Sequence, residues 1–304
     1  MSATQFRPYA IIEAPSVLGL KPTGVEELPE ALLRESLAER LQARRAGCVA
    51  APPYDPRRDP VSMTLNDVAI AAYATQLADA VSAVLTAGEF PLVLGGDCSI
   101  LLGPTLALRR RGRFGLLFID GHADFYQPEV NPNGEAASMD LAFATGHGPS
   151  LLTDLEGRGP LVRSADVALF GFRDAEEQAQ FHSQPLPPDL KALDLSAVRA
   201  LGVTAASRAA VAHLVRPELE GFFIHVDADC LSDDLMPAVD YRIPDGLTWE
   251  ELTTVLRVAL GTGKAVGLEV TIYNPRLDPT GAAGRGLAQV LADALGTRAP
   301  GGSS

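Results

Sequence analysis

The chain has 304 residues, 47% of them hydrophobic and 21% charged, a composition typical of a globular protein with a sizeable core. Its formal net charge of −13 at pH 7 argues against sequence-independent binding to nucleic acid or to an anionic membrane, and mildly favours a cationic small substrate. Three cysteines without CxxC spacing do not form a disulfide framework. The N-terminus lacks a secretory pattern, and no stretch approaches ~18 uninterrupted apolar residues, so we expect a soluble cytoplasmic protein.

Apolar runs alternate with helical spacing along the chain. In chain order the pattern predicts a strand over 9–15, helices over 30–43 and 66–88, strands over 90–96, 114–120, 167–172 and 222–227, a helix over 248–263, a strand over 265–270 and a helix over 286–295. The runs are short and do not alternate in polarity, as expected for a parallel sheet covered on both faces. The sequence therefore predicts one α/β/α domain over residues 1–304, with a flexible tail at about 297–304.

Local signals mark some of the predicted helix ends. Asn66 stands where a capping residue is expected, and Gly88 follows the same helix. Thr248 with Glu251 three residues later has the spacing of a capping box. The Pro-rich stretch 51–60 is expected to be a surface loop.

Polar residues close five of the predicted strands. They occur in "GGDCS" (95–99), "DGHAD" (120–124), "GFRDAEE" (171–177), "DADC" (227–230) and "EVTIYNP" (269–275). In open parallel sheets, ligands bind beyond the carboxyl ends of the strands. These five segments are therefore the candidate functional loops.

Two of these segments have the spacing of metal ligands. Asp120, His122 and Asp124 alternate, so in an extended segment they project to one side, and Asp227 and Asp229 repeat this spacing. Either cluster alone could instead cap backbone N–H groups. Together, four carboxylates in a small space would repel each other unless divalent cations were bound. Such an oxygen-rich donor set suits Mn²⁺ better than Zn²⁺, and five ligands favour a metal pair roughly 3.5–4 Å apart.

The motifs "GGDCS", "DGHAD", "DADCLSDD" and "EVTIYNP" resemble, in order, those of the ureohydrolase family of arginases, agmatinases and related amidinohydrolases. The resemblance covers most of the chain. It implies a three-layer α/β/α sandwich with a central, mainly parallel sheet and two Mn²⁺ ions per subunit. It also implies hydrolysis of a guanidino or amidino C–N bond by a metal-bridging hydroxide, releasing urea or a related product, in a homotrimer or homohexamer.

The resemblance assigns a role to several residues. It implies one metal held by Cys98, Asp120, Asp124 and Asp227, and a second held by Asp120, His122, Asp227 and Asp229. Asp124 would also accept a proton and pass it to the leaving amine. Glu269 falls where the family has a carboxylate that binds the substrate guanidinium. Glu176 falls where a carboxylate can meet an α-ammonium group. Tyr126 stands where arginases have an asparagine that binds the α-carboxylate, so free arginine is a doubtful substrate.

Other positions depart from the family pattern. Cys98 replaces a ligand histidine, and because a thiolate is softer than imidazole, the first metal is expected to bind weakly or to be another divalent ion. Alternatively, Cys98 is a small buried residue that only points at the site. Ala137 stands where arginases have a proton-shuttling histidine, and His147 is a candidate replacement. His225 is expected to point away from the ligands or to lie behind them.

Three functions remain open from the sequence. The first is an amidinohydrolase, resembling the N-hydroxyarginine amidinohydrolase-like subgroup in "DGHADF" and "IPDG". The second is a catalytically impaired homologue that binds metal or ligand, with Cys98 and Ala137 as the cause. The third is a zinc-dependent amidase related to deacetylases, which the paired acidic motifs do not favour.

Overall fold

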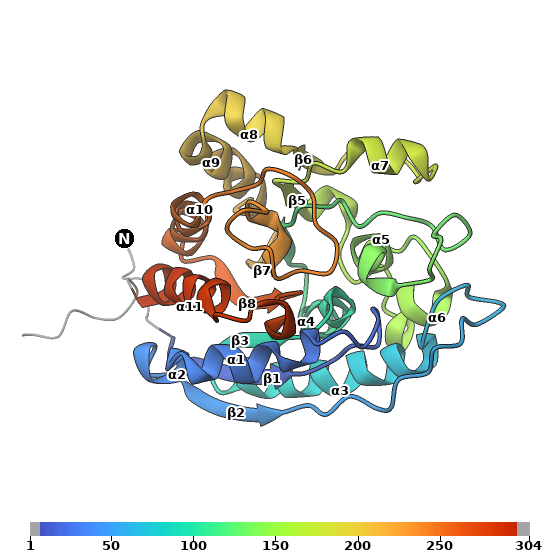
Figure 1. Ribbon diagram of the computed structural model, residues 1–304, viewed down its shortest axis with the longest axis horizontal. Helices are drawn as coiled ribbons and strands as arrows, with labels where there is room; N and C mark the ends of the chain where they lie inside the picture. The colour runs from blue at the N-terminus through green and yellow to red at the C-terminus, as the bar shows by residue number, and fades with distance from the viewer. Residues whose placement is uncertain (1–6, 297–304) are drawn as a thin grey trace, which may run out of the picture.

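The computed structural model describes residues 7–296, and eight of its strands form one parallel sheet (Figure 1). The strands are β1 (Tyr9–Ala14), β2 (Arg44–Cys48), β3 (Phe90–Gly95), β4 (Gly115–Ile119), β5 (Val167–Phe170), β6 (Lys191–Leu193), β7 (Phe222–Asp227) and β8 (Ala265–Thr271). Their order across the sheet is β2-β1-β3-β8-β7-β4-β5-β6. The three-layer α/β fold expected from the sequence is confirmed, whereas the predicted tail at 297–304 lies outside the described residues.

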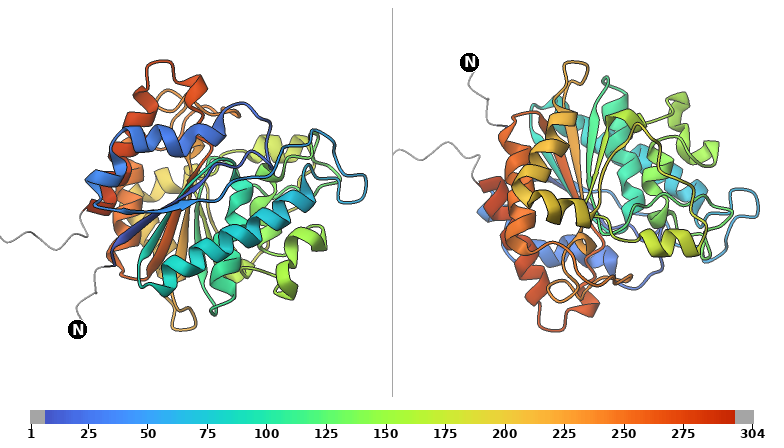
Figure 2. Two further views of the ribbon diagram at one scale, coloured as in Figure 1. Left: turned by 90° about the horizontal axis from the view of Figure 1, so that it is seen from below. Right: turned by 90° about the horizontal axis from the view of Figure 1, so that it is seen from above.

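Helices cover both faces of this sheet (Figure 2). They are α1 (Leu28–Arg34), α2 (Leu37–Arg40), α3 (Asp67–Thr86), α4 (Leu102–Arg109), α5 (Asp140–Ala144), α6 (Ser150–Thr153), α7 (Ala175–Gln180), α8 (Leu195–Leu201), α9 (Val203–Leu214), α10 (Trp249–Gly261) and α11 (Ala282–Leu295). One apolar core packs the sheet against α1, α2 and α8–α11, and a second packs it against α3–α6. Both faces of the central strands are thus buried, which explains why their sequences are continuously apolar.

α3 is the one helix in the described chain that is long and apolar enough to cross a membrane by length and composition. In the structure it packs on the sheet and buries Ile70, Leu77, Val81 and Val84 in the second core. Packing in the core therefore accounts for the apolar character of this helix.

The predicted helix ends are partly confirmed. Thr248 and Glu251 form the expected capping box at the start of α10. Gly88 follows α3 with a φ of 77°, which glycine adopts without strain. Asn66, however, does not cap α3 with its side chain, which instead accepts a hydrogen bond from the Asp55 N–H and donates one to the Leu18 carbonyl.

The segment predicted as a helix over 30–43 is divided into α1 and α2. The chain turns at Ser36 and Gln42, both with positive φ, and then enters β2. No sequence pattern predicted β2, because this strand is largely exposed at the edge of the sheet and has the polar sequence "RRAGC". β6 was missed because it has only three residues.

The loop that follows β3 passes very close to the residues after β1. A Cβ atom added at Gly96 would overlap the Ser16 carbonyl, and the next residue, Asp97, donates its N–H to that same oxygen at 3.1 Å. Only glycine allows two backbone segments to approach so closely. This contact fixes the position at which the chain leaves β3 and enters the candidate site.

Replacing Gly96 with alanine is expected to lower the free energy of unfolding by about 1–3 kcal/mol, because the methyl group would force the two backbones apart. Urea denaturation followed by circular dichroism measures this loss. Gly261→Ala is the matched control, since a Cβ at this last residue of α10 would have no heavy atom within 4 Å. Equal stability of the two variants would contradict the prediction.

Candidate metal centre

Four neighbouring strands, β3, β8, β7 and β4, bring their carboxyl ends together at the candidate site. After β3 the chain forms a short 3₁₀ helix, Cys98–Leu101, which Asp97 caps by accepting the Ser99 N–H at 2.9 Å. The Asp97 carboxylate therefore stabilises this helix and is in neither group of metal-ligand candidates. The cap places the Cys98 sulfur 2.8 Å from Asp227 Oδ2 and 3.1 Å from the hydroxyl of Thr271, the last residue of β8.

The loop after β4 carries Asp120 and His122. Asp120 Oδ1 accepts the backbone N–H of His122 at 2.6 Å, which turns the imidazole back toward the end of the strand. His122 Nδ1 lies 2.9 Å from Asp229 Oδ2, and Gly121 donates its N–H to Asp229 Oδ1 at 3.0 Å. The loops after β4 and β7 are thus joined through Asp229.

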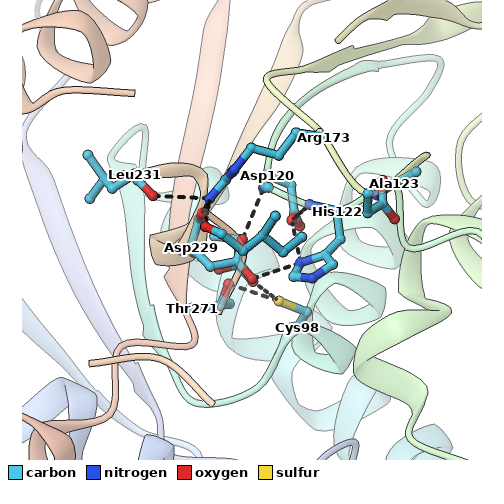
Figure 3. Close-up of polar contacts among 12 residues, drawn as sticks. Cys98, Asp120, His122, Ala123, Arg173, Asp229, Leu231 and Thr271 are labelled. Atoms are coloured by element: carbon cyan, nitrogen blue, oxygen red, sulfur yellow. Dashed lines mark hydrogen bonds and ion pairs between the residues drawn. The ribbon is translucent and has the colours of Figure 1, made fainter. Parts of the chain in front are cut away.

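The loop after β7 is held by its own hydrogen bonds and by Arg173. Asp227 Oδ1 accepts the Asp229 N–H at 2.7 Å and so fixes the short 3₁₀ helix Ala228–Cys230. From the other side, Arg173 donates to the carbonyl oxygens of Asp229 and Leu231 at 3.0 and 3.3 Å (Figure 3). These contacts orient the Asp229 carboxylate toward His122.

His225 points to the same side of β7 as the ligands, so of its two expected positions, pointing away from the ligands or lying behind them, the first is wrong. Its ring is fully buried and stacks on Phe118 with centroids 4.4 Å apart. Nδ1 lies 2.8 Å from Glu269 Oε1, and Nε2 lies 3.8 Å from Asp120 Oδ2. The spacing could have predicted this, because His225 precedes Asp227 by two residues and side chains two apart on a strand share a face.

The side chains form two donor groups that share Asp120. One group contains Cys98, Asp120, His225 and Asp227, the other contains Asp120, His122 and Asp229, and within each group the ligand atoms lie within 4.8 Å of one another. Asp120 Oδ2 and His225 Nε2 are buried without a hydrogen-bond partner, although such atoms are normally satisfied. Buried ligand atoms without a hydrogen-bond partner fit a bound metal ion. Asp124, predicted as a ligand of the first metal, is in neither group.

The charges of the site also favour bound cations. Burial, together with repulsion from neighbouring carboxylates, raises the pKa of Asp120 to about 6. The same two causes raise the pKa values of Asp124 and Asp227 well above the ordinary value for aspartate. Burial opposes the charged forms of Asp229 and His122 as well. Their mutual attraction outweighs that penalty, lowering the pKa of Asp229 to about 2 and raising the pKa of His122 to about 10. Divalent cations would relieve this excess of buried negative charge.

A cavity opens onto one side of the two donor groups. Its lining residues are Leu20, His122, Asp124, Tyr126, Asn131, Pro132, Asn133, Glu135, Ala137, Ser138, Glu177, Phe181, Asp227, Asp229, Asp240, Tyr241 and Ile272. Six of them are acidic, and none of them is a lysine or an arginine. Lys21 pairs with Glu135 at 3.4 Å from outside the lining, with its side chain 59% exposed. The cavity is therefore suited to a cationic ligand.

The structure does not place all the predicted substrate-binding residues in this cavity. Tyr126 lines it, and its buried hydroxyl has no hydrogen-bond partner. Glu176 lies outside the lining. The next residue, Glu177, lines the cavity instead. Glu269 is fully buried in β8, hydrogen-bonded to His225 and outside the lining.

No histidine replaces the expected proton shuttle within the cavity lining, apart from the candidate ligand His122. Ala137 does line the cavity, at the position where the family resemblance leads one to expect a histidine. His147 lies against Phe125 and borders a different hollow, near Val61 and Gln127. His147 is therefore outside the cavity lining, and its role as a proton shuttle stays a prediction.

Ile272 is a cavity residue that the sequence did not reveal. It follows β8 with a φ of 70°, which is rare for a β-branched residue, and donates its N–H to the Gly96 carbonyl at 2.8 Å. No sequence pattern signals such a backbone conformation. Ile272 contributes an apolar side chain to the otherwise acidic cavity lining.

The chain is similar to known proteins over almost its whole length. A family profile described as "Arginase family" matches residues 7–296. The arginase of Bacillus caldovelox is 28% identical over 280 residues, covering 90% of this chain and 92% of that protein. The arginase of Bacillus subtilis (strain 168) is 27% identical over 299 residues, covering 96% and 99%. The solved structure of the Bacillus caldovelox arginase matches with a TM-score of 0.84 at 26% identity, covering 95% and 98%.

Proposed function

Since this chain belongs to the arginase family, we propose that it is a metal-dependent hydrolase that cleaves a C–N bond of a guanidino or amidino compound and releases urea or a related product. The observation that carries the proposal is the meeting of two donor groups, joined by Asp120, beside an acidic cavity. The acidic lining supplies the charge that a guanidinium ion requires, and the donor groups supply sites for divalent cations.

The two donor groups would each hold one divalent cation. We expect Mn²⁺ in the group of Asp120, His122 and Asp229, whose donors are mostly oxygen. The group with Cys98 would hold the other. Cations bound there would supply Lewis acidity and lower the pKa of water at the site.

Within the cavity, the chain's own carboxylates would bind the substrate and move protons. Guanidinium forms charge-assisted hydrogen bonds with carboxylates, and Glu177 and Asp240 line the cavity outside both donor groups. Asp124 also lines it, and because burial raises the pKa of this carboxyl group, Asp124 can hold a proton and donate it to a leaving amine. The Tyr126 hydroxyl is free to bond a polar group of the substrate.

Glu269 has a different part in this proposal from the one that the motif suggested. Its Oε1 accepts or shares the proton at His225 Nδ1 and so fixes the ring. Glu269 is thus a positioning residue, one layer away from the substrate.

Urea release tests the proposed function. The full chain, stripped with a chelator and reloaded with Mn²⁺, is incubated with a panel of guanidino and amidino compounds, and urea and the product amine are measured. We expect metal-dependent turnover of at least one compound and none by the stripped protein. Full metal occupancy without turnover of any compound would contradict the proposal and favour a catalytically impaired homologue.

A further inference from the structure

We propose that Cys98, Asp120, His225 and Asp227 form a mixed sulfur–nitrogen–oxygen site that binds a borderline-soft metal, Zn²⁺ being the representative ion, in preference to Mn²⁺. The inference deepens the proposed function and rests on it for the presence of a metal centre. It adds that the two positions differ in the metal they select, and that His225 is a ligand.

The geometry brings four buried donors of three chemical kinds to one point. The Cys98 sulfur, the His225 imidazole and the two carboxylates offer atoms that all lie within 4.8 Å of one another. His225 Nε2 and Asp120 Oδ2 face each other at 3.8 Å, and neither has a hydrogen-bond partner. A buried nitrogen and a buried oxygen without partners, separated by more than a hydrogen bond, leave room for an ion between them.

The surroundings of His225 prepare Nε2 to be a metal ligand. The hydrogen bond between Nδ1 and Glu269 Oε1, at 2.8 Å, favours the tautomer in which Nδ1 carries the proton. The lone pair of Nε2 is then directed at the donor group. Metal-bound histidines commonly have such a carboxylate on the second ring nitrogen. Stacking on Phe118 holds the plane of the ring.

The donor types decide which metal fits. A thiolate is a soft ligand that selects zinc or another late metal, and one sulfur, one nitrogen and two oxygens complete the four ligands that zinc prefers. Asp120, His122 and Asp229 offer a harder set. His122 and Asp229 of the harder group line the cavity, whereas only Asp227 of the softer group does, and Cys98 and His225 are outside the lining. The softer site is therefore the inner one.

The stripped full chain is first loaded with Co²⁺, whose bond to a thiolate gives a strong charge-transfer absorption in the near ultraviolet. We expect this absorption in the native chain, its loss in Cys98→Ser, and its retention in Cys230→Ser, which changes a buried cysteine outside both groups. His225→Gln should keep the absorption but weaken metal binding at least about 10–100-fold, as replacing even an outer partner of a ligand does.

Competition between Mn²⁺ and Zn²⁺ completes the test. After loading with both ions and desalting, elemental analysis should find about one zinc per chain in the native protein and far less in Cys98→Ser. Metal bound without thiolate absorption would overturn this inference while leaving the proposed hydrolysis intact; no bound metal at all would contradict both.

Discussion

Asp120→Ala is expected to remove both metals and to reduce urea release at least about 100-fold, since changes even to the outer partners of ligands cost 10–100-fold. Asp120 is the one residue common to the two donor groups in the described chain. Its Oδ1 also accepts the His122 N–H, so the variant releases a second ligand. Metal content by elemental analysis and urea release under saturating Mn²⁺ measure the two effects.

Asp234→Ala provides the control for Asp120→Ala. Asp234 is the exposed last residue of the "DADCLSDD" motif and lies outside both donor groups and outside the cavity lining. This variant should keep its metals and its activity. If Asp120→Ala also kept both, Asp120 would not link the two sites and the proposed centre would be wrong.

The charge of the substrate is expected to decide how fast it is hydrolysed. Agmatine and arginine differ by one α-carboxylate, and outside the two donor groups the cavity lining offers four acidic side chains and no basic one. The amides that could receive a carboxylate are already engaged: Asn131 donates to Ser138, and Asn133 donates to Glu135. Because like charges repel strongly in a partly desolvated site, we expect kcat/KM for agmatine to exceed that for arginine at least about tenfold.

Neutral variants of the lining should reduce this preference. Glu177→Gln removes a charge from the cavity wall and is expected to lower the ratio of the two kcat/KM values severalfold. Glu176→Gln is the matched control, because the neighbouring residue lies outside the lining and its change should leave the ratio unaltered. Arginine turned over as well as agmatine by the native protein would show that the cavity does not select against a carboxylate.

The parts of the fold that could be predicted from the sequence are those in which one interaction dominates. The six predicted strands are confirmed because burial on both faces makes them continuously apolar. β2 could not be predicted, because an exposed edge strand has no apolar pattern. The break between α1 and α2 depends on positive φ at Ser36, which tertiary contacts impose and the local sequence does not signal. The homotrimer or homohexamer and the cytoplasmic location expected from the sequence stay predictions.

The candidate site divides in the same way. The sequence could predict that Asp120, His122, Asp227 and Asp229 meet, because the ends of parallel strands share an edge. It could not show that Asp124, with a φ of 45°, leaves the donor groups and joins the cavity wall. Motif position placed Glu269 at the substrate, but the register of β7 and β8 pairs it with His225. The contact between Glu269 and His225 depends on the register of the two strands, which cannot be read from a single sequence.

The proposed pair of metal sites can be tested by anomalous diffraction from a crystal of the full chain soaked with Mn²⁺ and Zn²⁺. We expect two metal peaks that share Asp120. One should lie among Asp120, His122 and Asp229, and the other among Cys98, Asp120, His225 and Asp227. An absence of metal at both positions, with these side chains ordered and hydrogen-bonded only to each other, would contradict it.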